Sequence, residues 1–291
     1  MIGTVHWGYV IALVVATIAA SWLMTALVRR GSKSAAKDLA VPLLFGLWII
    51  AVWQFTVLAF DIPPILLPPP TQAAYQLVQQ AGALWGDFRQ TFLKATLAGF
   101  ALGCGLGLAV AVLTDRVRFL QRGLLPLGNL VSAVPIVGIA PIMVNWFGFD
   151  WQSKAAVIVV MTFFPMLVNT LAGLAAADAM QRDLMHSYAA SYAQTLVKLR
   201  LPAALPFIFN ALKINSTLAL IGAIVAEFFG SHTIGLGFRI NTEAGRNDFA
   251  MVWAAIAVAA VAGSAFYGLL ALIERRLTFW HPSYRSKLRS S

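Results

Sequence analysis

Apolar residues fall in long runs along this chain, separated by short polar or proline-rich stretches. A helix needs ~20 largely apolar residues to cross the hydrocarbon core of a bilayer. Runs of about that length or longer lie at residues 7–28, 40–60, 90–114, 123–147, 154–176, 204–229 and 249–273. The pattern therefore predicts seven membrane-crossing helices.

Prolines modify two parts of this pattern. The run at 123–147 contains Pro126, Pro135 and Pro141, so we expect a kinked or broken helix whose freed backbone groups find partners inside protein or in a wet cavity. Segment 62–87 contains five prolines between Pro63 and Pro70, which exclude a continuous span. It predicts an external loop leading into a short amphipathic helix around Gln72–Gln80.

Composition supports a membrane protein. Hydrophobic residues make up 60% of the chain, charged residues 11%, and the mean hydropathy is +0.79. Soluble domains carry roughly 25% charged residues, so a soluble protein this apolar could not cover its surface. The formal charge of +10 does not indicate nucleic-acid binding, because the basic residues lie at the ends of apolar runs. The single cysteine, Cys104, excludes an intrachain disulfide.

Lysine and arginine set the predicted orientation. Fifteen of the 21 lie in segments 29–39, 115–122, 177–200 and 274–291, whereas five lie in the segments on the other side of the spans. Positive charge favours the cytoplasmic side, so we expect residue 1 outside and the C-terminus inside. The first nine residues contain no lysine or arginine. A signal peptide carries its charge ahead of the apolar run, and we therefore expect a retained helix.

The stretch from Asp183 to Pro206 is polar and basic although it lies between two apolar runs. Within it, apolar residues recur at three- or four-residue steps, which predicts one stripe on a short helix: Leu184, Tyr188, Tyr192, Leu196 and Leu199. Such a stripe lies either on the membrane surface or in the groove of a partner protein.

Several motifs occur in a fixed order between residues 40 and 275. They are Leu67–Thr71, Gln90 to Gly107, Pro135 to Gly148, Phe163 to Gly173, Asp183 to Pro202, and Ala226 to Gly237. In this order the chain resembles the permease subunits of ABC importers, in the branch that includes nitrate, sulfonate, taurine and thiamine-precursor systems. In the cytoplasmic loop of that family, an E-A-A triplet is followed by glycine; here Asp183-Leu184-Met185 and Ala189 take those places.

The resemblance implies an all-α polytopic membrane protein, with a type I ABC-importer core of six spans plus one extra N-terminal span. It divides the chain into an extra helix and basic linker (1–38), a permease domain (39–275) with a coupling loop (178–202), and a basic tail (276–291). The implied location is the bacterial inner membrane.

The same resemblance implies partners rather than cofactors. We expect a second permease copy, two cytoplasmic ATPases that bind ATP and magnesium, and an external substrate-binding protein. This chain itself is expected to bind no cofactor or metal. The residues expected at the ATPase contact are Asp183, Leu184, Met185, Tyr188, Ala189, Tyr192, Leu196 and Pro202.

Polar and conformationally special residues within the runs are candidates for the transport pathway, because polar groups at membrane depth must face protein or water. They are Asn129, Ser132, Pro135, Asn145, Phe163, Asn169, Asn215, Thr217 and Glu227. The alternative for the polar members is interhelical hydrogen bonding. Gly99, Gly103 and Gly107 form a face that lets another helix approach closely, which favours packing within the chain over a dimer seam.

Two ionisable residues lie inside the last-but-one predicted span. Lys213 is expected to extend towards the cytoplasmic surface. Glu227 either holds the external loop, through Arg239 or backbone N–H groups, or lines the pathway. Proton coupling would need a relay of acids, and the predicted spans contain no second acid.

Catalysis has no support in the sequence. There is no phosphate-binding G-x-x-x-x-G-K-[ST] loop, and the four histidines are scattered. We expect a transport subunit, with an ion-gradient-driven secondary transporter as the alternative. For the solute we favour a pyrimidine or other vitamin-precursor heterocycle over a nitrate- or sulfonate-type anion, because segments Ser187–Ser191 and Lys198–Pro202 are most similar to that branch.

Overall fold

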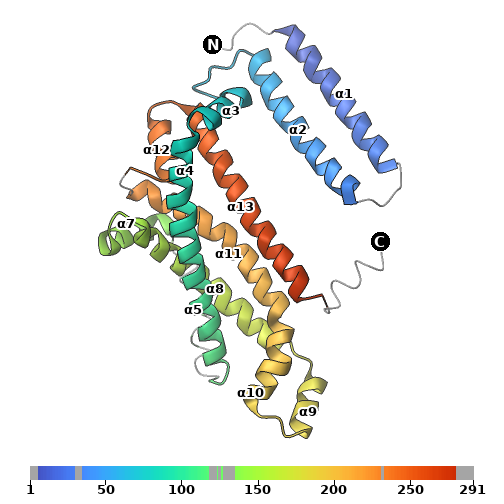
Figure 1. Cartoon of the computed structure of the whole chain (residues 1–291), viewed down its shortest axis with the longest axis vertical. Coiled ribbons are helices and arrows are strands. Elements are labelled where there is room, and N and C mark those ends of the chain that lie inside the picture. Colours follow the sequence, from blue (N-terminus) through green and yellow to red (C-terminus); the bar gives the residue numbers. More distant parts are fainter. Residues whose placement is uncertain are drawn as a thin grey trace. The chain divides into compact units, whose positions relative to one another are not determined.

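The computed structural model describes residues 6–29, 35–117, 123, 126, 135–230 and 233–279. This part of the chain is helical and contains no strand, which confirms the all-α prediction (Figure 1). The helices are α1 (Trp7–Arg29), α2 (Ala35–Ala59), α3 (Pro70–Gln79), α4 (Ala81–Phe88), η1 (Arg89–Thr96), α5 (Leu97–Thr114), α7 (Ile136–Phe147), α8 (Trp151–Ala175), α9 (Ala179–Ser187), α10 (Tyr192–Thr195), η2 (Leu196–Arg200), α11 (Leu201–Phe229), α12 (Leu236–Gly245) and α13 (Phe249–Leu277).

Six helical segments among the described residues are long and apolar enough to cross a membrane. They start at Trp7, Ala40, Ala81, Trp151, Tyr192 and Phe249. Each corresponds to a predicted span, but the third and fifth are longer than expected because short π-helical stretches, η1 and η2, continue them. Asn129 and Ser132 of the other predicted run lie outside the described residues.

Pro135 and Pro70 stand where helices start, whereas Pro141 lies inside the continuous helix α7. Pro135 precedes the first residue of α7 with an extended backbone, so the described helix of that run begins only at Ile136. Pro70 opens α3, where its fixed φ suits a first helical turn. The short helix predicted after the proline-rich loop is therefore confirmed as Pro70–Gln79.

The chain divides into two units, each described by itself. In the first, which takes in the described residues up to 82 and residues 240–256, α1 and α2 form a helical hairpin. The Trp48 Nε1–H donates to Thr17 Oγ1 across that hairpin at 3.3 Å. The rings of Trp53 and Trp253 lie 4.6 Å apart between their centroids.

The second unit takes in the described residues of 83–239 and 257–279 and is built around α5, α8 and α11. A Cβ at Gly99 would lie 2.6 Å from the Ile158 Cβ, and one at Gly107 would lie 2.5 Å from the Phe163 carbonyl oxygen. Gly103 likewise faces Thr162 and Val159. The glycine face therefore packs α5 against α8 within the chain, as predicted.

Candidate functional site

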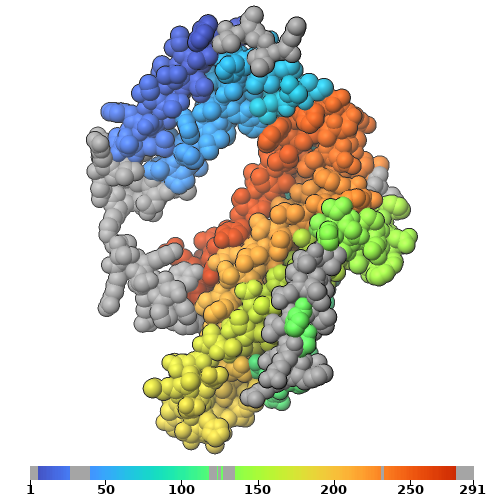
Figure 2. Space-filling view, turned by 180° about the vertical axis from the view of Figure 1, so that it is seen from behind, coloured from blue at the N-terminus to red at the C-terminus, as the bar shows by residue number. Residues whose placement is uncertain are grey.

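The 178–202 segment folds as two short helices joined by a turn, instead of one. Asp178 caps α9 by accepting the Met180 N–H at 2.9 Å. The helix ends at Ser187 with Tyr188 as its C-cap, and Ala189 then takes a left-handed backbone with φ of 53°. Ser191 restarts the chain as α10 with a capping box to Gln194. Figure 2 shows this segment, in yellow, as a projection at one end of the second unit.

The turn corrects the prediction of a single apolar stripe. Leu184 and Tyr188 are 55% and 77% exposed. Tyr192 and Leu196 instead pack against the core cluster that contains Leu174, and Leu196 is buried. The stripe is thus split because the left-handed residue between the helices reorients the second half. Met180, which the sequence pattern missed, adds an exposed apolar side chain.

The other residues expected at the ATPase contact vary in exposure. Asp183 and Ala189 are exposed, and Met185 is half-buried. Pro202 is half-buried in the first turn of α11. An outward surface of this segment is therefore formed by Met180, Asp183, Leu184 and Tyr188, and we call it the outer face of the 178–202 segment.

Behind the outer face lies a set of polar contacts that we call the Asp115 network: Asp115, Arg116, Tyr192, Arg200 and the Leu174 carbonyl. Arg200 donates to both oxygens of Asp115, at 2.5 and 2.8 Å. Arg200 Nε also donates to the Leu174 carbonyl at 3.0 Å. The Tyr192 hydroxyl donates to Asp115 Oδ2 at 2.7 Å, and the Arg116 guanidinium lies 3.9 Å from the Tyr192 ring centroid.

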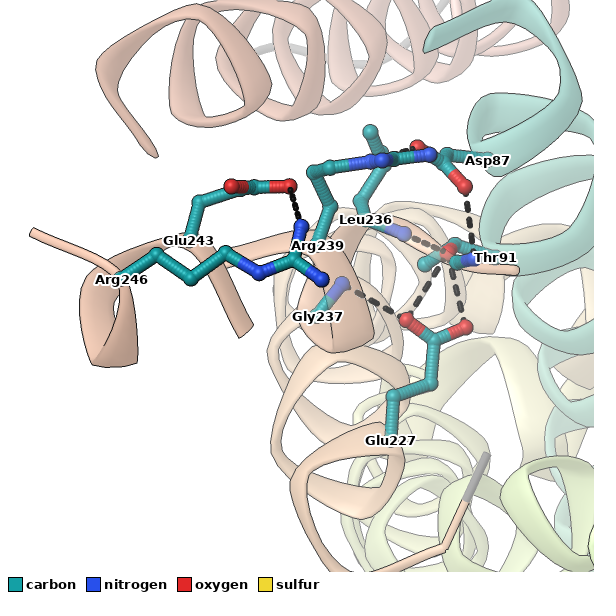
Figure 3. Close-up of polar contacts among 9 residues, drawn as sticks. Asp87, Thr91, Glu227, Leu236, Gly237, Arg239, Glu243 and Arg246 are labelled. Atoms are coloured by element: carbon teal, nitrogen blue, oxygen red, sulfur yellow. Dashed lines mark hydrogen bonds and ion pairs between the residues drawn. The ribbon is translucent and has the colours of Figure 1, made fainter. Parts of the chain in front are cut away.

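A second polar set lies at the opposite end of α11, and we call it the Glu227 network: Asp87, Thr91, Glu227, Arg239 and the backbone of 235–237 (Figure 3). The Thr91 hydroxyl donates to Glu227 at 2.7 Å, and Gly237 N–H donates to the same carboxylate at 2.7 Å. Leu236 N–H donates to Thr91 Oγ1 at 2.7 Å. The carboxylate therefore fixes the connection between α11 and α12.

Arg239 was one of the two partners expected for Glu227, but it pairs with Asp87 instead. Arg239 Nε pairs with Asp87 Oδ2 at 2.8 Å, and Gly235 N–H donates to the other Asp87 oxygen at 2.8 Å. Glu227 uses backbone N–H groups and Thr91 instead. A Cβ at Gly235 would lie 2.6 Å from the Glu227 carboxyl, and its φ of 146° also favours glycine.

Four further ionisable side chains lie in or beside the helices of the second unit. The Lys213 ammonium pairs with Glu274 at 2.7 Å, and its extension towards the cytoplasmic surface stays a prediction. Lys154 is buried and donates to the Phe149 carbonyl at 2.6 Å. Asp150 accepts from Gln90 at 2.6 Å, and that hydrogen bond lowers the pKa of its carboxyl.

Most polar pathway candidates bond within or between helices. The Asn215 amide donates across to the Thr162 carbonyl at 2.9 Å, and the Asn169 amide to the Pro165 carbonyl at 2.8 Å. The Asn215 bond joins α11 to α8 and matches the alternative of interhelical hydrogen bonding, whereas the Asn169 bond lies within α8. Phe163 is half-buried, whereas Asn145 and Thr217 are exposed.

One face of α11 combines exposure with polarity. Its exposed residues recur at intervals of three, four or seven: Phe207, Asn210, Ile214, Thr217, Ile221 and Phe228. We call this the α11 stripe. Asn210 was missed, although its seven-residue spacing from Thr217 could have indicated a shared face. Among the described residues, no group of three or more side chains is suited to hold a metal ion.

Comparison with known proteins identifies the family. Residues 97–279 match the family model described as "Binding-protein-dependent transport system inner membrane component". The chain is 31% identical over 243 residues to the formylaminopyrimidine transport permease protein ThiX of Halalkalibacterium halodurans, covering 82% of this chain and 95% of that protein. It is 32% identical over 244 residues to the putative aliphatic sulfonates transport permease protein SsuC of Bacillus subtilis, covering 83% and 88%.

A solved structure agrees on the fold. The crystal structure of an amino acid ABC transporter with histidines matches with a TM-score of 0.57 at 18% identity, covering 69% of this chain and 97% of that one. The relatives are transport subunits rather than enzymes, as predicted. The chain therefore belongs to the family of inner-membrane permease components of binding-protein-dependent ABC importers.

Proposed function

We propose that two copies of this permease form the pathway of an importer for a neutral heterocycle of the pyrimidine or vitamin-precursor type, driven by two ATPases that dock on the outer faces of the 178–202 segments. An external binding protein delivers the solute. The proposed orientation has residue 1 outside and the C-terminus in the cytoplasm, because that places fifteen of the 21 lysines and arginines inside.

The α11 stripe supports this pathway. Asn210 and Thr217 are exposed on a helix apolar enough to span the membrane. An exposed amide at that depth must face protein or water, and a second copy with a wet passage supplies both. Thr217 satisfies its hydroxyl at the Ile214 carbonyl, 2.8 Å away, so its remaining acceptor capacity is available to a passing solute.

The chemistry of the stripe supports a neutral solute, and this observation carries the choice of substrate. Its six residues are aromatic, aliphatic, amide or hydroxyl, and none is charged. The cation on the same helix, Lys213, is paired with Glu274. A heterocycle can stack on aromatic rings and bond an amide, whereas a sulfonate would lack a counter-charge there. The relatives include a formylaminopyrimidine permease at 31% identity and a sulfonate permease at 32%, so the choice of solute rests on the stripe.

An uptake experiment tests the solute. Cells that express the permease with its ATPase and binding protein are given labelled formylaminopyrimidine or labelled taurine. We expect uptake of the heterocycle and not of taurine, and persistence of uptake when a protonophore is added at constant ATP. Preferential taurine uptake would contradict the substrate assignment.

The matched variants Thr217→Val and Thr25→Val test the stripe. Both threonines are exposed and bond a carbonyl of their own helix. We expect the first to lower uptake and the second to leave it unchanged. Equal uptake by the two variants would remove Thr217 from the pathway.

Cysteine labelling tests the orientation. In a Cys104→Ser background, Gln72→Cys and Gln181→Cys replace two exposed glutamines, in α3 and in α9. An impermeant maleimide added to intact spheroplasts should label position 72 and spare position 181 until the membrane is opened. The reverse pattern would place the 178–202 segment outside and exclude ATPase docking there.

A further inference from the structure

The structure assigns a mechanical role to the Asp115 network: we propose that it is the joint that carries movement of the 178–202 segment into α5 and α8. This inference rests on the proposed function, since it presupposes an ATPase on the outer face. The residues of the joint are positioning residues, and none of them needs to touch the solute.

Three helix ends converge on the joint. Asp115 directly follows α5, the Leu174 carbonyl belongs to the last turn of α8, and Arg200 ends η2 where α11 begins. One guanidinium bonds both neighbours at once, because its fork reaches the two oxygens of Asp115 while Nε reaches Leu174. A displacement of Arg200 must therefore move both helix ends or break these bonds.

The segment itself transmits displacement through α10. None of the nine residues of α9, all of which the structure describes, is buried, so that helix is held by its ends. The four-residue helix α10 is too short to be stable alone. It is held by its capping box, by the Tyr192 hydroxyl on Asp115 and by Arg116 over the ring. The route from the outer face to α5 thus passes through Tyr192.

The ion pair between Asp115 and Arg200 is expected to stay formed when the 178–202 segment moves. The side chains of Asp115 and Arg200 are 5% and 16% exposed. Separating such a pair leaves a poorly solvated charge on each side, which costs far more than opening an exposed pair. A lone exposed salt bridge would yield when the segment moves; this one transmits the movement.

Spin-label distances between the two copies test the joint. In a Cys104→Ser background, Met180→Cys reports on the outer face and Leu113→Cys on the end of α5; both side chains are exposed. The complete transporter is measured without nucleotide and after trapping with MgATP and vanadate. In the otherwise unchanged chain we expect both inter-copy distances to shift on trapping.

Asp115→Asn should separate the two shifts. We expect ATPase recovery and the shift at position 180 to persist. The population of molecules that shifts at position 113 should fall by roughly tenfold, which is within the range of coupling energies between residues of one salt-bridge network. Asp61→Asn, the same change at an exposed position of the first unit, should alter neither shift. Arg200→Gln should match Asp115→Asn, and the double variant should be no worse than either single one.

An undiminished shift at position 113 in both single variants would overturn the joint. A loss of ATPase from them would also overturn it, because the network would then be part of the docking surface. If the charge variants do not fold, Tyr192→Phe, which removes one hydroxyl, replaces them in the experiment. In that case an undiminished shift at position 113 in Tyr192→Phe also overturns the proposal. If the otherwise unchanged chain recruits no ATPase, the proposed function itself fails.

Discussion

The Glu227 and Asp115 networks hold opposite ends of the same helix in different ways. Arg200, directly before α11, and Glu227, near its end, are 27 positions apart, which corresponds to about 40 Å at the rise of an α-helix. The Glu227 network binds backbone N–H groups of the 235–237 connection and is buried at Asp87, Thr91 and Glu227. The Asp115 network binds its segment mainly through side chains and leaves an outer face exposed.

This difference indicates which end can move. A buried carboxylate that satisfies backbone donors cannot leave without stranding them, so the Glu227 end is fixed. The 178–202 segment has a turn at Ala189 and an unburied helix, α9. Each network also includes a residue of a π-helical stretch: Thr91 lies in η1 and Arg200 in η2. Such stretches are frequent at functional positions.

The largest effect should come from Glu227→Leu. It strands the Thr91 hydroxyl and the Gly237 N–H inside the protein, and at about 1–3 kcal/mol for each unsatisfied buried donor we expect a loss of about 2–6 kcal/mol. Glu227→Gln keeps the shape and one acceptor oxygen, so its loss should be about half as large. Unfolding in detergent, followed by tryptophan fluorescence, measures both. Equal stability of the Leu variant and the natural chain would show that the network does not anchor this end.

The local elements of the fold could be predicted from the sequence, whereas the ion pairs and hydrogen bonds between distant residues could not. Apolar run length located the spans, the glycine spacing gave the α5–α8 contact, and Pro70 gave the start of α3, because each signal is local. The pairing of Asp87 with Arg239, or of Lys213 with Glu274, joins residues 152 and 61 positions apart. No local pattern encodes such pairs. Asp87 and Glu274 were also placed outside the spans, because charges end an apolar run even where the helix continues.

The coupling surface was only partly predictable for a similar reason. Spacing placed Leu184, Tyr188, Tyr192 and Leu196 on one stripe because it assumed one continuous helix. The left-handed residue Ala189 ends that helix. Alanine gives no warning of such a conformation, whereas the glycine found there in the family pattern would have. The family resemblance contained the signal that the residue itself did not.

Tyr188→Ala should have the second-largest effect, on association rather than folding. Tyr188 is 77% exposed, so its removal costs the chain little stability. Truncating a large anchor at an interface costs on the order of 2 kcal/mol or more, which weakens ATPase binding by roughly thirtyfold at 1.4 kcal/mol per decade. Co-purification with the ATPase measures it. Tyr75→Ala, at an exposed tyrosine of α3, is the control, and full ATPase recovery with Tyr188→Ala would remove it from the contact.

Ala189→Gly should have a smaller effect of opposite sign. The left-handed backbone at φ of 53° is strained for alanine, and glycine relieves roughly 1–2 kcal/mol of that strain while losing about 0.5–1 kcal/mol to added freedom of the unfolded chain. We expect slower proteolysis within the 178–202 segment. Ala190→Gly, where the backbone is not left-handed, should accelerate it. Faster cleavage of both variants would contradict the strain at Ala189.

Asp183→Ala should have the smallest effect, although the resemblance places Asp183 at the acidic position of the family loop. Its side chain is exposed on α9, and an exposed charge contact is usually worth less than about 1 kcal/mol. ATPase binding should therefore weaken by at most about fivefold. Because screening shortens the reach of exposed charges from ~10 Å at 0.1 M salt to ~3 Å at 1 M, the deficit should fade as salt is added. The deficit of Tyr188→Ala, which arises from apolar contact, should persist. A deficit for Asp183→Ala that equals the one for Tyr188→Ala and resists salt would show that the acid is buried against the ATPase, and that the outer face is anchored by charge rather than by apolar contact.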